Sequence, residues 1–490
     1  MATSSRSGED FAAWIFVHEW LERGETLYIN IWDHKDFGFF LFNFPFFEIG
    51  GTIGLLFGGL FSTALFGGGI FIGMTRYLRV VSAIVVSLIS TILYVLSPTF
   101  LATYTENQAI ALAVLAIALL GKAPVLAGVI LAASTSVKVA GFGIAFFVIV
   151  LMLVTDRFDD EVGTRTSQVS RRFGISYLMG IVGIGVVSAI LGVFRGWMEI
   201  ITYNIEYSAE RRSIRPSILE PLELLRFLIG DGETRIFLVL LLFGTLTLFA
   251  VASRTKLQSL NELPRSTSHT YSETRAWLAA FGLALGTFLG VLTQLPARPH
   301  HLGYLVGSTI YIASMATARI LQAWKSFVLS RKITFCVIVT FIFVSTAAFS
   351  VREDGITWPI RNPSKWGDLD RGKLRLEAGE HSKSAQSLAF VNFWGLGLDF
   401  DSLPSTWTLN CRFFYHLPHL VRRFEVEMLN CLRSDTDIVV LGTRNTMDSA
   451  FKSEIRQLLE TRYVQCENSL VVAEIWSLTL ATCPRVSNTT

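Results

Sequence analysis

The chain has 490 residues, of which 51% are hydrophobic and only 17% are charged, and its net charge at pH 7 is +3. A soluble domain normally carries about 25% charged residues, so this composition excludes an ordinary soluble protein and indicates a polytopic membrane protein. The small net charge and the lack of a lysine-rich tail argue against a nucleic-acid-binding protein. We therefore expect membrane lipids, and no nucleic acid, among its partners.

The N-terminal region is polar at first and then has apolar residues at helical spacing from Phe11 to Leu21. It lacks the basic n-region and the apolar h-region of a signal peptide. A polar island follows, in which four ionisable residues stand in a row: Asp33, His34, Lys35 and Asp36. They precede a Phe-rich run, residues 37–47, that we interpret as a membrane anchor or as part of a groove for a lipid tail. Ionisable groups at a membrane boundary are costly to desolvate, so we expect this island to have a function.

Apolar spans near the length of a membrane helix fill the middle of the chain. We place them near residues 50–73, 79–97, 106–120, 123–137, 139–155, 173–194, 235–252, 276–294, 302–320 and 333–350. After residue 350 the charged fraction rises and the apolar runs shorten to strand length. The predicted fold class is a polytopic α-helical membrane protein with about ten membrane helices and a C-terminal α/β domain. The predicted domains are residues 1–350, which begin with an outer loop over 1–49, and residues 351–490.

The basic residues indicate the orientation in the membrane. They gather in alternate loops, represented by Arg76, Lys122, Arg171, Lys256 and Lys325, and the positive-inside rule makes these loops cytoplasmic. The first loop and the C-terminal domain then lie outside the cytoplasm, which indicates a plasma-membrane protein with an extracytoplasmic active site. Because nothing in the first loop would carry it across, we expect a further membrane helix upstream, with translocation alongside the first hairpin as the alternative.

The C-terminal segment combines strands and helices. Strands are predicted at 387–394 and 436–443 and as a hairpin over 461–476, and helices near 418–432 and 447–460. Four cysteines fall in this segment: Cys411, Cys431, Cys466 and Cys483. An even number of cysteines outside the cytosol predicts disulfides, and the sequence leaves their connectivity open. Cys336 lies in an apolar span and is interpreted as packing.

Motifs of several common enzyme classes do not occur. The sequence has no GxxxxGK[ST] phosphate loop, no GxSxG nucleophile elbow and no HExxH zinc motif. An outward-facing enzyme has no supply of nucleotide, whereas carboxylates and basic residues near the bilayer suit transfer from a lipid phosphate. A carboxylate can take the proton of an attacking hydroxyl, and Arg, Lys, His or a cation can hold the phosphate as it leaves.

The first loop resembles that of the GT-C membrane glycosyltransferases, in the branch of the dolichyl-phosphate-mannose protein mannosyltransferases and their bacterial relatives that use lipid-phosphate sugars. That family has an acidic residue, an amphipathic helix ending in Gly, and the motif Tyr-x-Asp-x-x-Asp-x-Lys-Pro-Pro. Asp10 precedes a helix ending at Gly24, and Tyr28, Asp33 and Lys35 fall at matching places. The departures are Asn30 in place of the first Asp of the motif, and Asp36 and Phe37 in place of the prolines.

Weaker matches follow in chain order. They are YTENQ at 104–108, a glycine-containing span ending in Lys138, WMEIITYNIEYS at 197–208 and RPHHLGYLVGS at 298–308. The resemblance implies a polyprenyl-phosphate sugar donor, an inverting transfer, and a glycan, lipid or protein acceptor outside the cytoplasm. It implies that Asp10 is the catalytic base, with its neighbour Glu9 as the alternative, and that Asp33 or Glu106 assists the reaction or holds a metal. Lys35 would face the donor phosphate.

Each of these residues also has a structural interpretation. Asp10 is a favoured N-cap for the helix that follows it, and Asp33 with Lys35 could form an ordinary surface pair. Glu106 opens a membrane helix whose dipole favours an acidic residue there. Lys138 is expected to snorkel to the membrane interface.

Further basic residues stand in the predicted outer loops. Arg211 and Arg212 break the positive-inside pattern, so they are expected to bind a lipid phosphate or anionic headgroups. His300 and His301 lie beside Arg298 and are interpreted as interface residues or as further phosphate contacts. No cofactor is certain from these residues. A divalent cation at Asp33 and His34 is a candidate, with a hydrogen-bonded interface residue as the alternative for His34.

The predicted function is an inverting glycosyltransferase that moves a sugar from a polyprenyl-phosphate donor to an acceptor hydroxyl on the outer face of the membrane. The rival interpretation is a transporter or flippase of lipid-linked sugars. Transporters often have paired halves and binding groups near the middle of the bilayer, whereas this sequence lacks such pairing and its candidate site lies at one surface.

Overall fold

The computed structural model describes most of the chain. The described residues are 6–97, 104–139, 141–160, 168–213, 241–250, 267–293, 299–324, 329–330, 332–333, 335–340, 373–377, 386–391, 403–413, 422–434, 436–442, 449–466, 473–479 and 483–489. The chain divides into two compact units. The helical unit comprises Lys35–Val187 and Arg215–Ile356, and the mixed unit comprises Met1–His34, Ser188–Ile214 and Thr357–Thr490. The predicted domain division at residue 350 stays a prediction.

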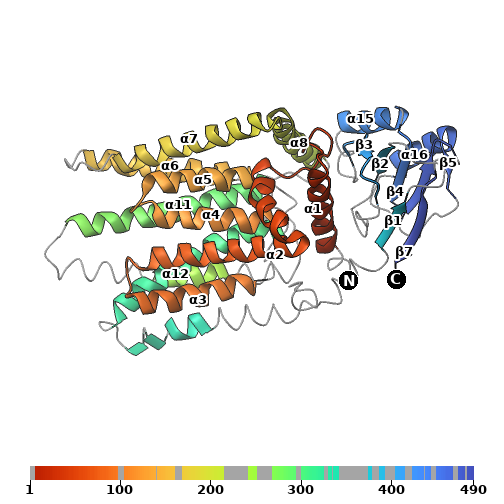
Figure 1. Ribbon diagram of the computed structural model, residues 1–490. Coiled ribbons are helices and arrows are strands. Elements are labelled where there is room, and N and C mark those ends of the chain that lie inside the picture. The colour runs from red at the N-terminus through yellow and green to blue at the C-terminus, as the bar shows by residue number, and fades with distance from the viewer. Residues whose placement is uncertain are drawn as a thin grey trace. The chain divides into compact units, whose positions relative to one another are not determined.

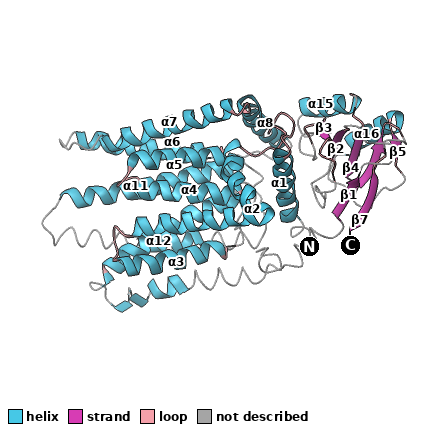
Figure 2. Cartoon of the chain, in the orientation of Figure 1, coloured by secondary structure: helices cyan, strands magenta, loops and turns pink. Residues whose placement is uncertain are grey.

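The described part of the helical unit consists of helices (Figures 1 and 2), and most of them are apolar. Its helices are α2 (Phe37–Met74), α3 (Val80–Val95), α4 (Thr105–Leu119), α5 (Pro124–Val137), α6 (Gly141–Asp160), α7 (Gln168–Ile190, whose last turn belongs to the mixed unit), α11 (Thr267–Thr293), the short 3₁₀ helix η2 (Pro299–Leu302) and α12 (Gly303–Gln322). Residues 241–250 and 335–340 are helical as well. Each span predicted before residue 325 coincides with helix over its described part, apart from a few residues at its ends. Of the span 235–252 the structure describes residues 241–250, and the last span lies largely outside the described residues.

Four helices among the described residues are long and apolar enough to cross a membrane: Ile53–Met74, Val169–Ile190, Glu273–Leu292 and Gly303–Gln322. Six shorter apolar helices accompany them. On α7 the side chains of Ile175, Leu178, Val182 and Val186 form a stripe at helical spacing, and each is at least half exposed. Such a stripe is unfavourable in water and favourable against lipid tails. The predicted polytopic α-helical membrane fold is confirmed.

Helix α4 occupies the centre of the helical unit. Its sequence, TENQAIALAVLAIAL, is apolar after the first turn, and nearly all of its side chains are buried. It packs against α2, α5, α11 and α12. Polar groups at its N-terminal end are therefore surrounded by protein rather than by lipid.

Helix α2 is broken into two parts at Gly50 and Gly51, where Gly51 has a φ of +53°. The first part folds back onto the second, since a side chain at Gly54 would lie 1.7 Å from the carbonyl oxygen of Phe46. The ring of Phe46 lies 5.6 Å from that of Phe61. The Phe-rich run was interpreted as a membrane anchor or groove wall. It is a helix with an inward face, because its residues Phe37, Phe39, Phe40 and Phe47 are each at most 4% exposed, while Leu41 is 43% exposed. The role as anchor or groove wall stays a prediction.

Polar contacts gather at the two ends of these helices. Glu106 lies in the first turn of α4, whereas Lys122 follows the C-terminus of the same helix and donates to Thr75 Oγ1 over 3.3 Å. Near Lys122, Arg76 donates to the carbonyl of Ala118 over 2.8 Å. The loops with Arg76 and Lys122, which the alternating basic residues assign to one side, therefore meet at one end of the unit.

The mixed unit contains α1 (Arg6–Glu22), α8 (Phe194–Ser213), α15 (Arg422–Arg433), α16 (Ser449–Arg462) and two sheets. One sheet has the strand order β3-β2-β4-β6-β5, formed by β3 (Thr408–Leu409), β2 (Ser387–Val391), β4 (Ile438–Gly442), β6 (Ala473–Ser477) and β5 (Val464–Gln465). The strands β3, β2 and β4 are parallel, and β6 pairs antiparallel with β4 and β5. A separate antiparallel pair joins β1 (Lys373–Glu377) to β7 (Arg485–Thr489). The predicted strands, the β5–β6 hairpin and the two predicted helices are all present (Figure 2).

Helix α1 packs on this sheet and begins earlier than expected. The ring of Phe16 lies 5.0 Å from that of Phe390 on β2, and Trp20 lies 6.3 Å from the same ring. Because α1 begins at Arg6, the backbone of Asp10 is inside the helix. The interpretation of Asp10 as the N-cap was therefore wrong.

The disulfide connectivity left open by the sequence is Cys411–Cys431 and Cys466–Cys483. The first bond joins the segment after β3 to α15, and the second joins the segments that flank β6. Cys336 is exposed on the helical unit rather than packed in its interior.

Candidate functional site

A buried ion pair marks one end of the helical unit. The Glu106 carboxylate is 1% exposed and pairs with Nζ of Lys138, the residue that directly follows α5. Thr105 Oγ1 donates to Glu106 Oε2 over 2.8 Å. His301 on η2 places Nε2 3.7 Å from Glu106 Oε1. Lys138 was expected to snorkel, but only 15% of its side chain is exposed, because the Glu106 carboxylate is available inside the protein.

The end of the polar island reaches the same place. Asp36 precedes α2, and its Oδ2 accepts the backbone N–H of Val139 over 2.9 Å. Lys35 lies close enough to Lys138 for the two charges to interact. We call Lys35, Asp36, Glu106, Lys138 and His301 the Glu106 cluster. It combines two carboxylates, which can take up a proton, with two ammonium groups and an imidazole, which can bind an anion such as phosphate.

Neutral polar residues support the Glu106 cluster from behind. The hydroxyl of Tyr94 donates to Asn107 Oδ1 over 2.5 Å. The side-chain amides of Asn43 and Gln108 donate to each other, over 3.0 and 2.8 Å. These bonds join α2 and α3 to the first turn of α4. Because buried polar groups must be paired, they hold the backbone around Glu106 in one arrangement.

Asp33 and His34 belong to the mixed unit, whereas Lys35 and Asp36 belong to the helical unit. Asp33 is 1% exposed, and its Oδ1 lies 3.5 Å from Nδ1 of His34. The carbonyl of His34 accepts a hydrogen bond from Asn204 of α8 over 3.4 Å. Asp33 is therefore a buried carboxylate beside an imidazole rather than an exposed surface group, and its pairing with Lys35 stays a prediction.

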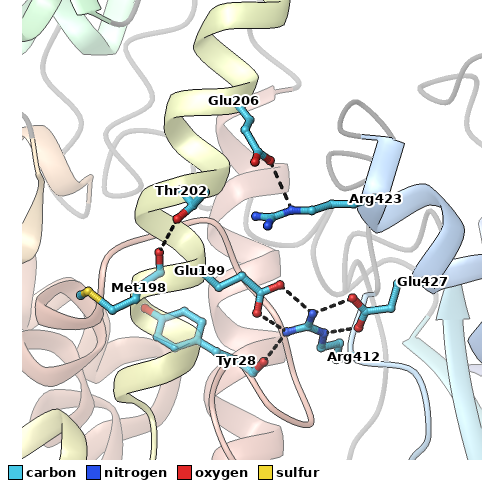
Figure 3. Close-up of polar contacts among 8 residues, drawn as sticks. All are labelled: Tyr28, Met198, Glu199, Thr202, Glu206, Arg412, Arg423 and Glu427. Carbon is cyan, nitrogen blue, oxygen red and sulfur yellow. Dashed lines mark hydrogen bonds and ion pairs between the residues drawn. The ribbon is translucent and has the colours of Figure 1, made fainter.

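An arginine of the mixed unit binds the loop before Asp33 (Figure 3). Arg412 pairs with Glu199 of α8 and with Glu427 of α15, over 2.8 and 2.6 Å. It also donates to the carbonyl of Tyr28 over 2.9 Å. Burial alone would lower the pKa of Arg412, but the two carboxylates outweigh it and raise that pKa, so the guanidinium stays charged.

Several predicted residues are only partly described. Glu9 and Asp10 lie on α1, and Arg211 and Arg212 lie in the last turn of α8, but their side chains are outside the described residues. His300 is on η2, again by its backbone alone, and Arg298 is outside the described residues. Of the predicted residues, the structure brings together Lys35, Glu106 and His301.

The sequence analysis did not identify Lys138 as the partner of Glu106, or Arg412 as the residue that binds the first loop. Lys138 had a usable signal, because α4 and α5 are joined by a short turn, so the start of α4 and the end of α5 must lie side by side. Arg412 had no such signal, since Glu199 is 213 residues away along the chain. Asp36 was noted in the island without a role.

No group of three or more His, Cys, Asp or Glu side chains suited to a metal ion occurs among the residues that the structure describes. Asp33 and His34 could supply two of the ligands of a divalent cation. A divalent cation there would take its remaining ligands from a substrate or from water, as is usual for Mg²⁺.

Comparisons with known proteins assign no family to the chain. No protein-family model matches the sequence, and no curated protein matches it either. Among solved structures, the chain is similar to an oligosaccharyltransferase of Archaeoglobus fulgidus that was crystallised with a tethered acceptor peptide. The two are 10% identical, with a TM-score of 0.40, over 95% of this chain and 67% of that one. A likeness this slight assigns neither a family nor an activity.

Proposed function

We propose that the chain is a polytopic membrane glycosyltransferase of the GT-C type, which transfers a sugar from a polyprenyl-phosphate donor to an acceptor hydroxyl. The observation that carries the proposal is the buried ion pair of Glu106 and Lys138, with His301 beside it, at one end of apolar helices. Charged groups placed among membrane helices are costly and serve binding or catalysis. The match of Tyr28, Asp33 and Lys35 to the first-loop motif of that family supports the same conclusion.

The Glu106 cluster suits a leaving phosphate. An ammonium group has three N–H donors, and Glu106 takes one from Lys138. The others, together with His301 and Lys35, can bind the phosphate oxygens of the donor. Because the Lys138 side chain is set in a poorly hydrated place, its ammonium group stabilises the charge that develops as the bond to the sugar breaks.

The proposed reaction is a single displacement. The acceptor hydroxyl attacks the anomeric carbon, the carbon–oxygen bond to the phosphate breaks, and polyprenyl phosphate leaves with the bonding electrons. The hydroxyl proton passes to the carboxylate of Asp10, or of Glu9 as the alternative. Asp33 and Glu106 assist, and Arg211, Arg212, Arg298 and His300 are proposed as further contacts to the donor phosphate. One attack from the face opposite the phosphate inverts the anomeric configuration.

The proposal includes an extracytoplasmic site in the plasma membrane and a glycan, lipid or protein acceptor outside the cytoplasm. The alternating basic loops support this orientation, since Glu106 lies at the end of α4 opposite to Lys122. A cysteine introduced near Glu106 should react with a membrane-impermeant thiol reagent in intact cells. One introduced near Lys122 should react only after lysis.

The test is transfer in lipid nanodiscs from a panel of radiolabelled polyprenyl-phosphate sugars, with release of polyprenyl phosphate as the readout. We expect loss of transfer in Asp10→Asn, Asp33→Asn, Glu106→Gln and Lys138→Met, and unchanged transfer in Arg319→Gln. Arg319 is a matched control because it forms an ion pair with Glu273 over 3.3 Å. This pair does not involve the Glu106 cluster. Full activity in all four variants would exclude the proposed site. In sealed vesicles, movement of the labelled lipid across the bilayer without bond cleavage would favour the transporter.

A further inference from the structure

We infer that Arg412, in the C-terminal part of the chain, is a positioning residue for the first loop, and holds the segment 25–34, which contains Asp33. The inference rests on the proposed function only in so far as Asp33 takes part in transfer. Its structural part concerns contacts inside the mixed unit, which contains the segment 25–34, α8 and α15.

The guanidinium of Arg412 uses all of its donors. Nε and Nη2 donate to the carboxylate of Glu427, over 2.6 and 2.8 Å. Nη1 and Nη2 donate to the carboxylate of Glu199, over 3.0 and 2.8 Å. The remaining N–H of Nη1 donates to the carbonyl of Tyr28 over 2.9 Å. Arginine has five N–H donors in a rigid plane, so this side chain joins α8, α15 and the first loop in one fixed geometry (Figure 3).

The loop backbone at Tyr28 needs such support. Tyr28 has a φ of +66°, which costs free energy for a residue with a side chain. Its side chain is fully buried, and a Cβ placed on Gly196 of α8 would lie 2.3 Å from Tyr28 Cβ. The hydrogen bond from Arg412 to the Tyr28 carbonyl therefore acts at the most strained point of the loop.

The same C-terminal segment binds the loop at further points. The backbone N–H of Trp32 donates to the carbonyl of Arg412 over 2.8 Å, and Glu25 accepts the N–H of Leu409 over 3.1 Å. The indole of Trp32 lies 4.9 Å from the ring of Tyr203 on α8 and 5.4 Å from that of Phe413. Trp32 directly precedes Asp33, so its fixed position limits where the Asp33 carboxylate can lie.

A neighbouring arginine provides a matched control. Arg423 of α15 pairs with Glu206 of α8 over 3.2 Å, and both side chains are more than a third exposed. It therefore bridges the same two helices as Arg412 (Figure 3). Among its recorded contacts, none reaches the segment 25–34.

The experiment compares Arg412→Gln, Arg412→Lys and Arg423→Gln by hydrogen exchange of the full chain in nanodiscs. We expect faster amide exchange in peptides covering 25–34 in both Arg412 variants, and wild-type exchange there in Arg423→Gln. Lysine does not restore protection from exchange, because one ammonium group cannot bind both carboxylates and the Tyr28 carbonyl in the planar geometry of a guanidinium. Unchanged exchange at 25–34 in Arg412→Gln, or an equal increase in Arg423→Gln, would overturn the inference.

Transfer assays supply the second arm. We expect turnover to fall roughly tenfold or more in Arg412→Gln, with the donor KM changed less than about twofold, since the loss is in the placement of a reacting group. Exchange that rises at 25–34 without any loss of turnover would overturn the positioning role. If the wild-type chain transfers no sugar, the proposed function fails while the exchange comparison still decides whether Arg412 holds the loop.

A second variant applies if Arg412→Gln unfolds throughout. Glu427→Gln removes an exposed partner of Arg412 and should raise exchange at 25–34 alone. Unchanged exchange there would overturn the inference.

Discussion

Glu106 and Lys138 form an ion pair that closes one end of the hairpin of α4 and α5, with the Glu106 side chain 1% and the Lys138 side chain 15% exposed. Two opposite charges taken out of water stabilise each other only while both are present. The pair is therefore a sensitive place in the fold, independent of any role in transfer. The proposed function adds a second role, in which Lys138 binds the donor phosphate together with Lys35 and His301.

Breaking the pair from one side should destabilise the protein strongly. We expect Lys138→Met to lower the free energy of unfolding by about 3–5 kcal/mol, because it leaves a buried carboxylate without its cation. The double variant Glu106→Gln/Lys138→Met should recover much of that loss, since no charge remains buried. Thermal unfolding in detergent measures both. A double variant as unstable as the sum of the two single variants would show that the charges do not compensate each other.

A second buried ion pair can be used to distinguish an effect on folding stability from an effect on sugar transfer. Asp156 of α6 pairs with Arg275 of α11, with side chains 7% and 9% exposed. We expect Asp156→Asn to destabilise the chain by an amount similar to a single change in the Glu106 pair. Transfer per folded molecule should be unchanged, because this pair involves none of the residues proposed to bind the donor. If Asp156→Asn lowered transfer per folded molecule as much as Glu106→Gln does, both ion pairs would act on transfer only through stability.

The helices were predictable because their signals are local. Apolar runs of membrane-helix length, interrupted by charged or Gly-containing turns, gave the positions of α3, α4 and α5 within a few residues. The first part of α2 was not predicted as a separate helix, because only the break at Gly51 shows that residues 37–50 fold back. Sequence alone gives the apolar character of such a run, but not whether its partner is lipid or protein.

The site was predictable only where its residues stand next to helix ends. Glu106 and His301 were singled out, and the structure places them 3.7 Å apart through η2. Their relation to Lys138 depends on how α4, α5 and α12 pack. Arg412 could not be found at all, because an ion pair with Glu199 leaves no mark in the sequence. Long-range pairs of this kind follow from tertiary packing, which composition and periodicity do not encode.

Close helix packing gives a prediction independent of charge. On α11, Gly282 and Gly286 stand four residues apart and face α6, and a Cβ at Gly286 would lie 2.2 Å from Cα of Ile144. Small residues at this spacing let two membrane helices approach closely. We expect Gly286→Ala to destabilise the chain by about 1–3 kcal/mol. Gly183→Ala on α7, which meets nothing within 4 Å, should be neutral or slightly stabilising in the same thermal assay. Equal effects of the two changes would contradict the close approach.

The two disulfides should differ in their effect on the first loop. They close chain segments with sequence separations of 20 and 17 residues, so removing either should cost a similar free energy, about 3 kcal/mol. Only Cys411–Cys431 adjoins Arg412. We expect Cys411→Ser/Cys431→Ser, and not Cys466→Ser/Cys483→Ser, to speed hydrogen exchange at residues 25–34. The same effect from both pairs of substitutions would indicate general loosening of the mixed unit.

His18 should make the mixed unit sensitive to acid. It is fully buried on α1, and burial lowers its pKa from 6.5 to about 4. The folded chain thus holds a neutral imidazole at pH values where the unfolded chain binds a proton. Its stabilising effect is complete above pH 6.5 and is lost as the pH falls from 6.5 towards 4. From pH 7 to pH 5 this amounts to about 2 kcal/mol of unfolding free energy.

The matching experiment is a comparison of wild type with His18→Gln, which cannot take up a proton, by thermal unfolding at pH 7 and pH 5. Glutamine costs some stability at both pH values, because its amide must fit a buried site. The difference between the two pH values should nevertheless be smaller in the variant by the amount that His18 contributes. If both proteins lose the same stability on acidification, the groups that titrate lie elsewhere, and the buried imidazole is not what makes folding pH-dependent.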